Sequence, residues 1–342
     1  MKKFIKKVFS IIFILIAVFA LFFYFGVFTK QIEKAKGYYY VYLGDKAYKK
    51  KDLVNAINFY KLGLEKYPAH YLAANNLGNI YVAYEDYFSA SDAYLLALKY
   101  KPEFLLCRIN YALILANQMK NYEEAINQYK KATDTKVTIV SIPFIYNNKE
   151  STIKNKGLAF YNMGLSYRAL SLLSDDNYVR NENLMKSKEM YENALKFLES
   201  DYNTFFNLAI ANHLLGNYKD AGQNYCKAIE LRPLDYEAHY NLAIMLKKMK
   251  RFKESYNELE KAVLIMDVNG DAKTSRYIFD ILNEVSQRLV VSGDYNYLVE
   301  HLSDESKDGN LTYIDGKVVV SDEFDEAMNN NMEVCEGKNL FF

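Results

Sequence analysis

Residues 202–235 read YNTFFNLAIANHLLGNYKDAGQNYCKAIELRPLD, and the segment from 236 to about 266 aligns with them at a shift of 34 residues. Under this shift Leu208 matches Leu242. A period of this length is typical of stacked helical hairpins, because one hairpin cannot bury its own apolar face without a neighbour. The repeat therefore predicts an all-α helical solenoid.

Each half of the repeat reads as one amphipathic helix. Phe205 and Ala209 lie four residues apart and share a helix face, where the small side chain of Ala209 allows a tight crossing. The pair Gly216-Asn217 is typical of a helix C-terminus. Pro233 ends the second helix, because proline lacks an N–H and disfavours helix at the preceding residue.

This order of residues resembles the tetratricopeptide repeat, in which a large residue, Leu, small and aromatic residues and a closing Pro follow one another. Two departures are Asn212, where an aromatic is usual, and Phe205 in place of Trp. The resemblance extends along most of the chain and implies about six to seven helix pairs. The predicted divisions are an N-terminal anchor or signal peptide (1–30), repeats one to three (37–132), an irregular insert (133–156), repeats four to six with a degenerate capping repeat (157–302), and a small hairpin with a mobile tail (303–342).

Two interruptions of the period stand out. Residues 137–146, VTIVSIPFIY, are rich in β-branched and aromatic residues and predict an extended segment, either a loop packed on the solenoid or a docking arm. An insertion near 175–185 separates the two helices of repeat four and predicts a loop on one rim. At the C-terminus, Asp315-Gly316 predicts a tight hairpin turn.

The N-terminus predicts a membrane segment. Four lysines precede residues 8–29, a run of 22 residues without a charge, which would span about 33 Å as a helix. A cleaved signal peptide is the alternative, with a cleavage site at Val18-Phe19-Ala20, but the apolar run continues beyond it. We expect an uncleaved, single-pass anchor. The lysine bias places the repeats outside the cytoplasm, on the periplasmic or outer face.

Composition argues against several functions. The 43 basic and 42 acidic residues leave a net charge of +1, which does not favour nucleic acid. The three cysteines are too few and too scattered for a disulfide framework, so Cys107 and Cys226 are interpreted as small buried hydrophobes. The four histidines lack metal-ligand spacing, and no phosphate-binding loop or nucleophile motif occurs. We therefore expect no enzyme, no catalytic or metal site, no cofactor and no small-molecule substrate.

Asparagine recurs at the sixth position of five repeats. Stacking would bring these side chains into a row on a concave surface, where carboxamides can pair with the backbone of an extended peptide. The row is similar to the asparagine ladder in the repeat arm of the O-linked N-acetylglucosamine transferase, although Asn is common at this position in tetratricopeptide repeats generally. The candidate groove residues, with two polar neighbours, are Asn76, Asn79, Asn110, Asn117, Asn162, Asn207 and Asn241.

Together these features predict a membrane-anchored interaction scaffold or assembly factor that binds an extended peptide or partner helix in its concave groove. The alternative is a secreted or envelope-associated binder of carbohydrate or cell-wall polymer, which would use the faces of the 32 tyrosines. The state of the mature N-terminus separates the two hypotheses, because only the alternative requires cleavage after Ala20.

Overall fold

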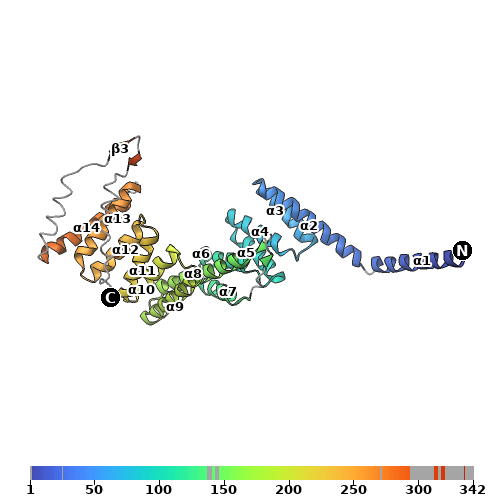
Figure 1. Ribbon diagram of the computed structural model, residues 1–342, viewed down its shortest axis with the longest axis horizontal. Helices are drawn as coiled ribbons and strands as arrows, with labels where there is room; N and C mark the ends of the chain where they lie inside the picture. Colours follow the sequence, from blue (N-terminus) through green and yellow to red (C-terminus); the bar gives the residue numbers. More distant parts are fainter. Residues whose placement is uncertain are drawn as a thin grey trace. The chain divides into compact units, whose positions relative to one another are not determined.

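The computed structural model describes residues 2–24, 26–136, 141–142, 146–269, 272–292, 312–314, 317–319 and Cys335. The chain divides into two compact units, Met1–Asn155 and Lys156–Phe342. The described residues are almost all helical (Figure 1), which confirms the predicted fold class.

The first unit begins with the apolar helix α1, Lys2–Tyr24. Its segment Lys7–Tyr24 has a mean hydropathy of 2.5 and is long and apolar enough to cross a membrane. The predicted uninterrupted run 8–29 is wrong as a single helix. Gly26 takes a left-handed φ of 71°, which a glycine adopts without steric cost, and a new helix starts directly after it.

Three helix pairs follow in the first unit, and each helix packs against the next one along the chain. The turns between the paired helices use a left-handed residue at Lys51, Glu85 and Lys120. The pairs are α2 (Val27–Lys49) with α3 (Leu53–Lys66), α4 (Tyr71–Ala83) with α5 (Tyr87–Tyr100), and α6 (Leu105–Asn117) with α7 (Tyr122–Asp134).

The second unit holds the segment that decides the fold. Residues 202–269 form two helix pairs, as predicted, and Gly216 takes a φ of 80° at the first turn. The pairs are α10 (Tyr202–Leu214) with α11 (Tyr218–Leu231), and α12 (Tyr236–Lys248) with α13 (Phe252–Asn269). Ahead of them α8 runs over Lys149–Leu173 and α9 over Asn177–Leu195; α14 (Ala272–Val291) packs against α13.

Side chains at the helix N-termini explain where several of the helices start. Asp52, Asp86, Asn121 and Asp201 each accept a hydrogen bond from the backbone N–H three residues later. Each such bond satisfies one of the N–H groups that has no partner inside the helix. These acceptors recur in both units, so local sequence helps to fix the start of each helix that carries one.

A tyrosine-on-glycine contact recurs in three repeats. A Cβ atom added at Gly44 would lie 2.7 Å from the Tyr60 ring, and one at Gly78 would lie 2.6 Å from the Tyr94 ring. Gly164 has the same relation to Tyr191, at 2.6 Å. The tyrosines are buried, so the missing side chain on one helix makes room for an aromatic ring from its partner helix.

The irregular segments differ from expectation in detail. Within the predicted insert, β1 (Ser141–Ile142) pairs antiparallel with β2 (Tyr146–Asn147), and α8 already begins at Lys149. The insertion near 175–185 is not a loop, because α9 starts at Asn177. The predicted C-terminal hairpin is confirmed by antiparallel pairing of β3 (Thr312–Ile314) with β4 (Lys317–Val319). The predicted second helix of the capping repeat, up to Leu302, lies outside the described residues.

Candidate functional site

Three of the predicted groove asparagines line one cavity in the first unit. Asn79, Asn110 and Asn117 come from α4 and α6, and the cavity has a volume of about 350 Å³. The remaining lining residues are Val82, Tyr87, Tyr94, Leu113, Ile114 and Gln118. This lining combines carboxamides with aromatic and aliphatic surface, a composition that suits both the backbone and the side chains of a peptide.

The polar part of this cavity is held in place by hydrogen bonds. Asn79 Oδ1 accepts from Tyr94 OH at 2.7 Å and from Asn110 Nδ2 at 3.2 Å. Burial raises the pKa of Tyr94, so its hydroxyl keeps its proton and remains a donor at neutral pH. Asn79 Oδ1 therefore already accepts two hydrogen bonds. The donors of this side chain are the two N–H groups of Nδ2.

The preceding repeat has a related arrangement. Tyr60 OH donates to Asp45 Oδ1 at 2.7 Å, and Asp45 lies 34 positions before Asn79. Asn76 accepts from Asn75 Nδ2 at 3.4 Å. Burial is the main cause that raises the pKa of Tyr60, and Asp45 raises it further. A hydrogen bond with Asn76 lowers the pKa of Tyr60 and so acts in the opposite direction. Asp45, Tyr60 and Asn76 correspond to Asn79, Tyr94 and Asn110 at the 34-residue shift. The two groups differ at the first position, which is an acid in one and a carboxamide in the other.

In the second unit, Asn207 is buried and makes contacts in several directions. Its Oδ1 accepts from Arg168 Nη1 at 2.6 Å, and its Nδ2 donates to Asn203 O at 2.8 Å and to Tyr161 OH at 3.2 Å. Asn207 also lines a cavity of about 510 Å³. The other lining residues are Tyr202, Asn203, Phe206, Arg232, Leu234, Asp235, Tyr236 and Glu237.

The last two predicted asparagines bond to their own helices. Asn162 Nδ2 donates to Leu158 O at 2.8 Å, and Asn241 Nδ2 donates to Glu237 O at 2.7 Å. Neither residue lines the two cavities described above. The structure thus gathers Asn79, Asn110 and Asn117 in the first unit and gives Asn207 a separate cavity in the second. A continuous ladder through all the repeats remains a prediction.

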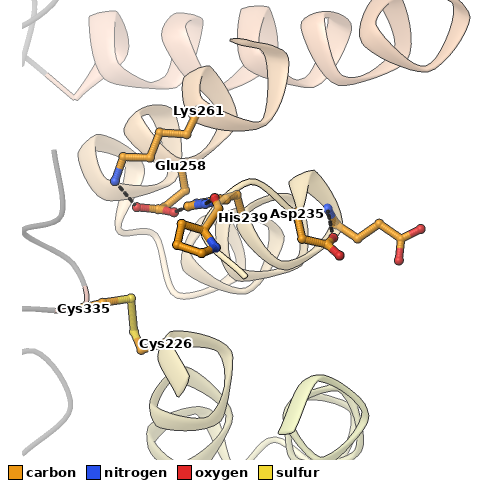
Figure 2. Close-up of polar contacts among 8 residues, drawn as sticks. Cys226, Asp235, His239, Glu258, Lys261 and Cys335 are labelled. Carbon is orange, nitrogen blue, oxygen red and sulfur yellow. Dashed lines mark hydrogen bonds and ion pairs between the residues drawn. A yellow bond between two sulfur atoms is a disulfide. The ribbon is translucent and has the colours of Figure 1, made fainter. Parts of the chain in front are cut away.

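The helices α12 and α13 enclose a charged cluster that sequence reasoning did not find. Figure 2 shows the Glu258 carboxylate between His239 and Lys261. His239 Nδ1 lies 2.6 Å from Glu258 Oε2, and Lys261 Nζ lies 2.8 Å from Glu258 Oε1. All three side chains are at most 5% exposed. Such burial is tolerated because each charged or polar head has a partner.

Cys226 corrects the interpretation of the cysteines. It forms a disulfide with Cys335, 109 positions later (Figure 2), rather than serving as a free buried hydrophobe. Cys107 is free and buried, as predicted. No spacing rule could have found the bond, because Cys335 lies in a segment whose acidic, Asn-rich composition predicts a tail without fixed contacts.

Sequence reasoning also missed Arg168 and Tyr161, whose contacts with Asn207 join α8 to α10. Neither residue belongs to the repeat pattern that singled out the asparagines. Arginine is scarce among the basic residues of this chain, and Arg168 stands within the apolar stripe of its helix. That placement was the available signal, because a cation there must find a partner or an opening to solvent.

Comparisons with known proteins agree with the helix pairs. The family model described as tetratricopeptide repeat matches residues 202–233 and 236–265, the two segments related by the 34-residue shift. No curated protein matches the chain.

One of the three solved structures compared with this chain, that of pilF, reaches a TM-score above 0.5 and shares the fold. That of pilF from Pseudomonas aeruginosa is 16% identical, with a TM-score of 0.53, over 73% of this chain and 98% of the other. YrrB, described as a TPR protein with an unusual peptide-binding site, is 15% identical, with a TM-score of 0.49, over 65% and 97%. A tetratricopeptide repeat protein from Parabacteroides merdae is 16% identical, with a TM-score of 0.49, over 87% and 99%.

Proposed function

Because this chain contains tetratricopeptide repeats, we propose that it is a non-catalytic interaction protein that holds an extended peptide or partner helix against its asparagine-bearing helices. The observation that carries the proposal is the cavity of the first unit, where Asn79, Asn110 and Asn117 lie beside the rings of Tyr87 and Tyr94. Carboxamides offer a donor and an acceptor to a peptide backbone whatever its side chains are, and aromatic rings add contact area.

Photo-crosslinking tests this proposal in intact cells. A photoreactive amino acid placed at Asn117, which is exposed at the cavity, should capture a discrete protein partner. The same amino acid at the exposed Asn127 on α7 is the matched control and should capture little. Replacing Asn110 by Ala together with Tyr87 by Ala should reduce the capture at least tenfold. Equal capture from the two positions, or capture of glycan instead of protein, would contradict the proposal.

We further propose that α1 anchors the chain and that the repeats lie outside the cytoplasm. The apolar segment Lys7–Tyr24 supports an anchor or a signal sequence. The disulfide between Cys226 and Cys335 supports the side, because such bonds form and persist in oxidising compartments and are rare in the cytosol. A protein so placed would act as a scaffold or assembly factor for partners at the membrane.

Thiol trapping in intact cells tests the side of the membrane. After acid quenching and denaturation without reductant, we expect a maleimide to label Cys107 alone, because the other two thiols are bonded to each other. Labelling should rise to three thiols after reduction. The Cys335→Ser variant should show two labelled thiols without reductant. Three labels in unreduced wild-type protein would place the repeats in a reducing compartment.

A further inference from the structure

One face of α2 is apolar and aromatic at its start, basic at its end, and exposed from Ile32 to Lys49. Its members, which we call the outer stripe of α2, recur every three or four residues as one helix face does: Ile32, Ala35, Tyr39, Tyr42, Lys46 and Lys49. Ile32, Tyr39 and Tyr42 are 47%, 59% and 60% exposed. A solenoid normally ends on a polar face, so an apolar stripe on its first helix indicates a surface that covers it.

The opposite face of α2 already packs against α3. A Cβ atom added at Gly37 would lie 2.5 Å from Tyr67 Cβ at the end of α3. Val41 is buried, and a Cβ atom added at Gly63 of α3 would lie 2.7 Å from its side chain. The pairing of α2 with α3 therefore leaves the outer stripe available for a contact outside this helix pair.

All the charge on the outer stripe is positive. α2 contains five lysines and two acidic residues, and both acidic residues interact with α3 instead of lying on the stripe. Asp45 accepts a hydrogen bond from the Tyr60 hydroxyl at 2.7 Å, and Glu33 lies 3.7 Å from Lys66 Nζ. The two lysines of the stripe are exposed in the last turn of α2. A partner for this face must therefore accept aromatic rings and positive charge together.

The outer stripe starts beside the segment that we propose as the anchor. The Phe28 ring of α2 packs against α1, with its centroid 4.7 Å from that of Phe19 and 6.4 Å from that of Phe22. With Lys7–Tyr24 in a bilayer, these rings mark the level at which the chain leaves the hydrocarbon. Tyrosine is enriched at that level, and lysine is attracted there by anionic headgroups.

A second copy of this chain fits the outer stripe less well. Two copies anchored in one bilayer would pair their α2 helices in parallel, and a twofold axis would bring each residue close to its own counterpart. Lys46 would then face Lys46, and Lys49 would face Lys49. The headgroup layer of an anionic bilayer instead offers the opposite charge.

We propose that the outer stripe binds the headgroup layer of an anionic bilayer, so that α2 runs along the membrane surface instead of standing on it. Ile32, Tyr39 and Tyr42 enter the interface, and the two lysines of the stripe contact lipid phosphates. This inference rests on the proposed anchoring by α1. It adds a second membrane contact, made by the first repeat itself.

Quenching of a fluorophore by labelled lipid tests the proposal. The full-length protein is placed in nanodiscs of phosphatidylcholine and phosphatidylglycerol, and an NBD fluorophore is attached to one introduced cysteine at a time. The native cysteines do not interfere under native conditions. Cys226 and Cys335 are bonded to each other, and burial raises the pKa of the Cys107 thiol to about 12.

Positions along α2 distinguish a helix on the surface from one that stands upright. Labels at Ala35→Cys and Lys46→Cys, about 17 Å apart along the helix, should be quenched equally by a nitroxide on the lipid headgroup. In an upright helix the Lys46→Cys label would lie farther from the lipid and be quenched less. A label at Asn127→Cys, exposed on α7, is the control and should be quenched several-fold less than both.

Variants then assign the contact to the outer stripe. Tyr39→Asp together with Tyr42→Asp should reduce the quenching of the Lys46→Cys label several-fold, because two acids replace the rings that enter the interface. Phe88→Asp is the matched control, since Phe88 lies on α5 and is 81% exposed, and it should leave the quenching unchanged. Circular dichroism melts of the variants establish that the fold is kept.

A label at Phe13→Cys on α1 separates this inference from the proposed anchor. Quenching of that label by a nitroxide on the acyl chain, without quenching at Lys46→Cys, would overturn the inference and leave the anchor standing. Disulfide-linked dimers through Ala35→Cys would then identify a second copy as the occupant. Equal quenching at Lys46→Cys in discs of phosphatidylcholine alone would overturn the preference for an anionic bilayer. An unquenched Phe13→Cys label would count against the anchor itself.

Discussion

Replacing Glu258 by Leu will lower the free energy of unfolding by about 3–5 kcal/mol. The reason is that Lys261 Nζ and His239 Nδ1 both lie against this carboxylate in a site that water does not reach. Leucine fills the volume but removes the carboxylate that lies against the buried ammonium and imidazole. The loss is measured as a shift in the urea midpoint, followed by the circular dichroism signal of the helices.

Glu254→Gln on the same helix is the control. Glu254 pairs with Arg251 at 3.0 Å but its side chain is 34% exposed, so its loss should cost less than about 1 kcal/mol. The double variant Glu258→Leu with Lys261→Leu should recover part of the stability, because it also removes the buried charge that faced Glu258. Equal losses for Glu258→Leu and Glu254→Gln would mean that the charged cluster does not contribute as its burial suggests.

The same cluster gives the stability a defined dependence on pH. Burial raises the pKa of the Glu258 carboxyl, but His239 and Lys261 outweigh it, and the net pKa lies below the ordinary value of 4.5. The stability that the ionised carboxylate contributes is therefore complete above about pH 4.5 and is lost as the pH falls through the lower pKa of the folded state. Wild-type protein should lose stability more steeply than Glu258→Gln below that pH.

The second large effect is expected at Tyr191, where substitution by Ala should cost about 3–5 kcal/mol. The Tyr191 ring is fully buried, lies against Gly164, and packs with Leu208 and Ala211. Because the backbone at Gly164 belongs to a long helix, it cannot collapse into the space that the ring leaves. Urea denaturation followed by circular dichroism measures the loss.

Tyr178→Ala is the matched control, since Tyr178 lies on the same helix α9 and is 77% exposed. Its loss should change the free energy of unfolding by no more than about 0.5 kcal/mol. Tyr191→Phe should be close to neutral, because the hydroxyl it removes has no partner among the described residues. A Tyr191→Ala variant as stable as Tyr178→Ala would show that the aromatic ring is not a core residue.

The repeat period predicted the helix pairs well, and the reason is physical. The 34-residue shift repeats the small residues at the crossings, as Ala209 and Ala243 show, and both are fully buried. Helix starts follow from side chains such as Asp86 and Asp201, which act within three residues of their own position. Information of this short range is available in the sequence without knowledge of the rest of the chain.

What could not be predicted depends on contacts between distant segments. The bond between Cys226 and Cys335 spans 109 positions, and no local pattern marks either partner. The contact of Arg168 with Asn207 joins different repeats, and the position of Arg168 is not one that the period preserves. The repeat pattern identified five asparagines that share the sixth position of their repeats. It could not show that Asn79 meets Asn110 while Asn162 bonds its own helix.

The helix α2 begins one residue after Gly26 and continues without a break to Lys49, as the first helix of repeat one. At 1.5 Å per residue this rod is only about 35 Å long, and no flexible tether precedes the first repeat among the described residues. With α1 in a bilayer, a ligand held by the first repeats would stay close to the lipid surface. Partners embedded in the same bilayer would meet the repeats at high local concentration, so weak contacts would be enough to retain them.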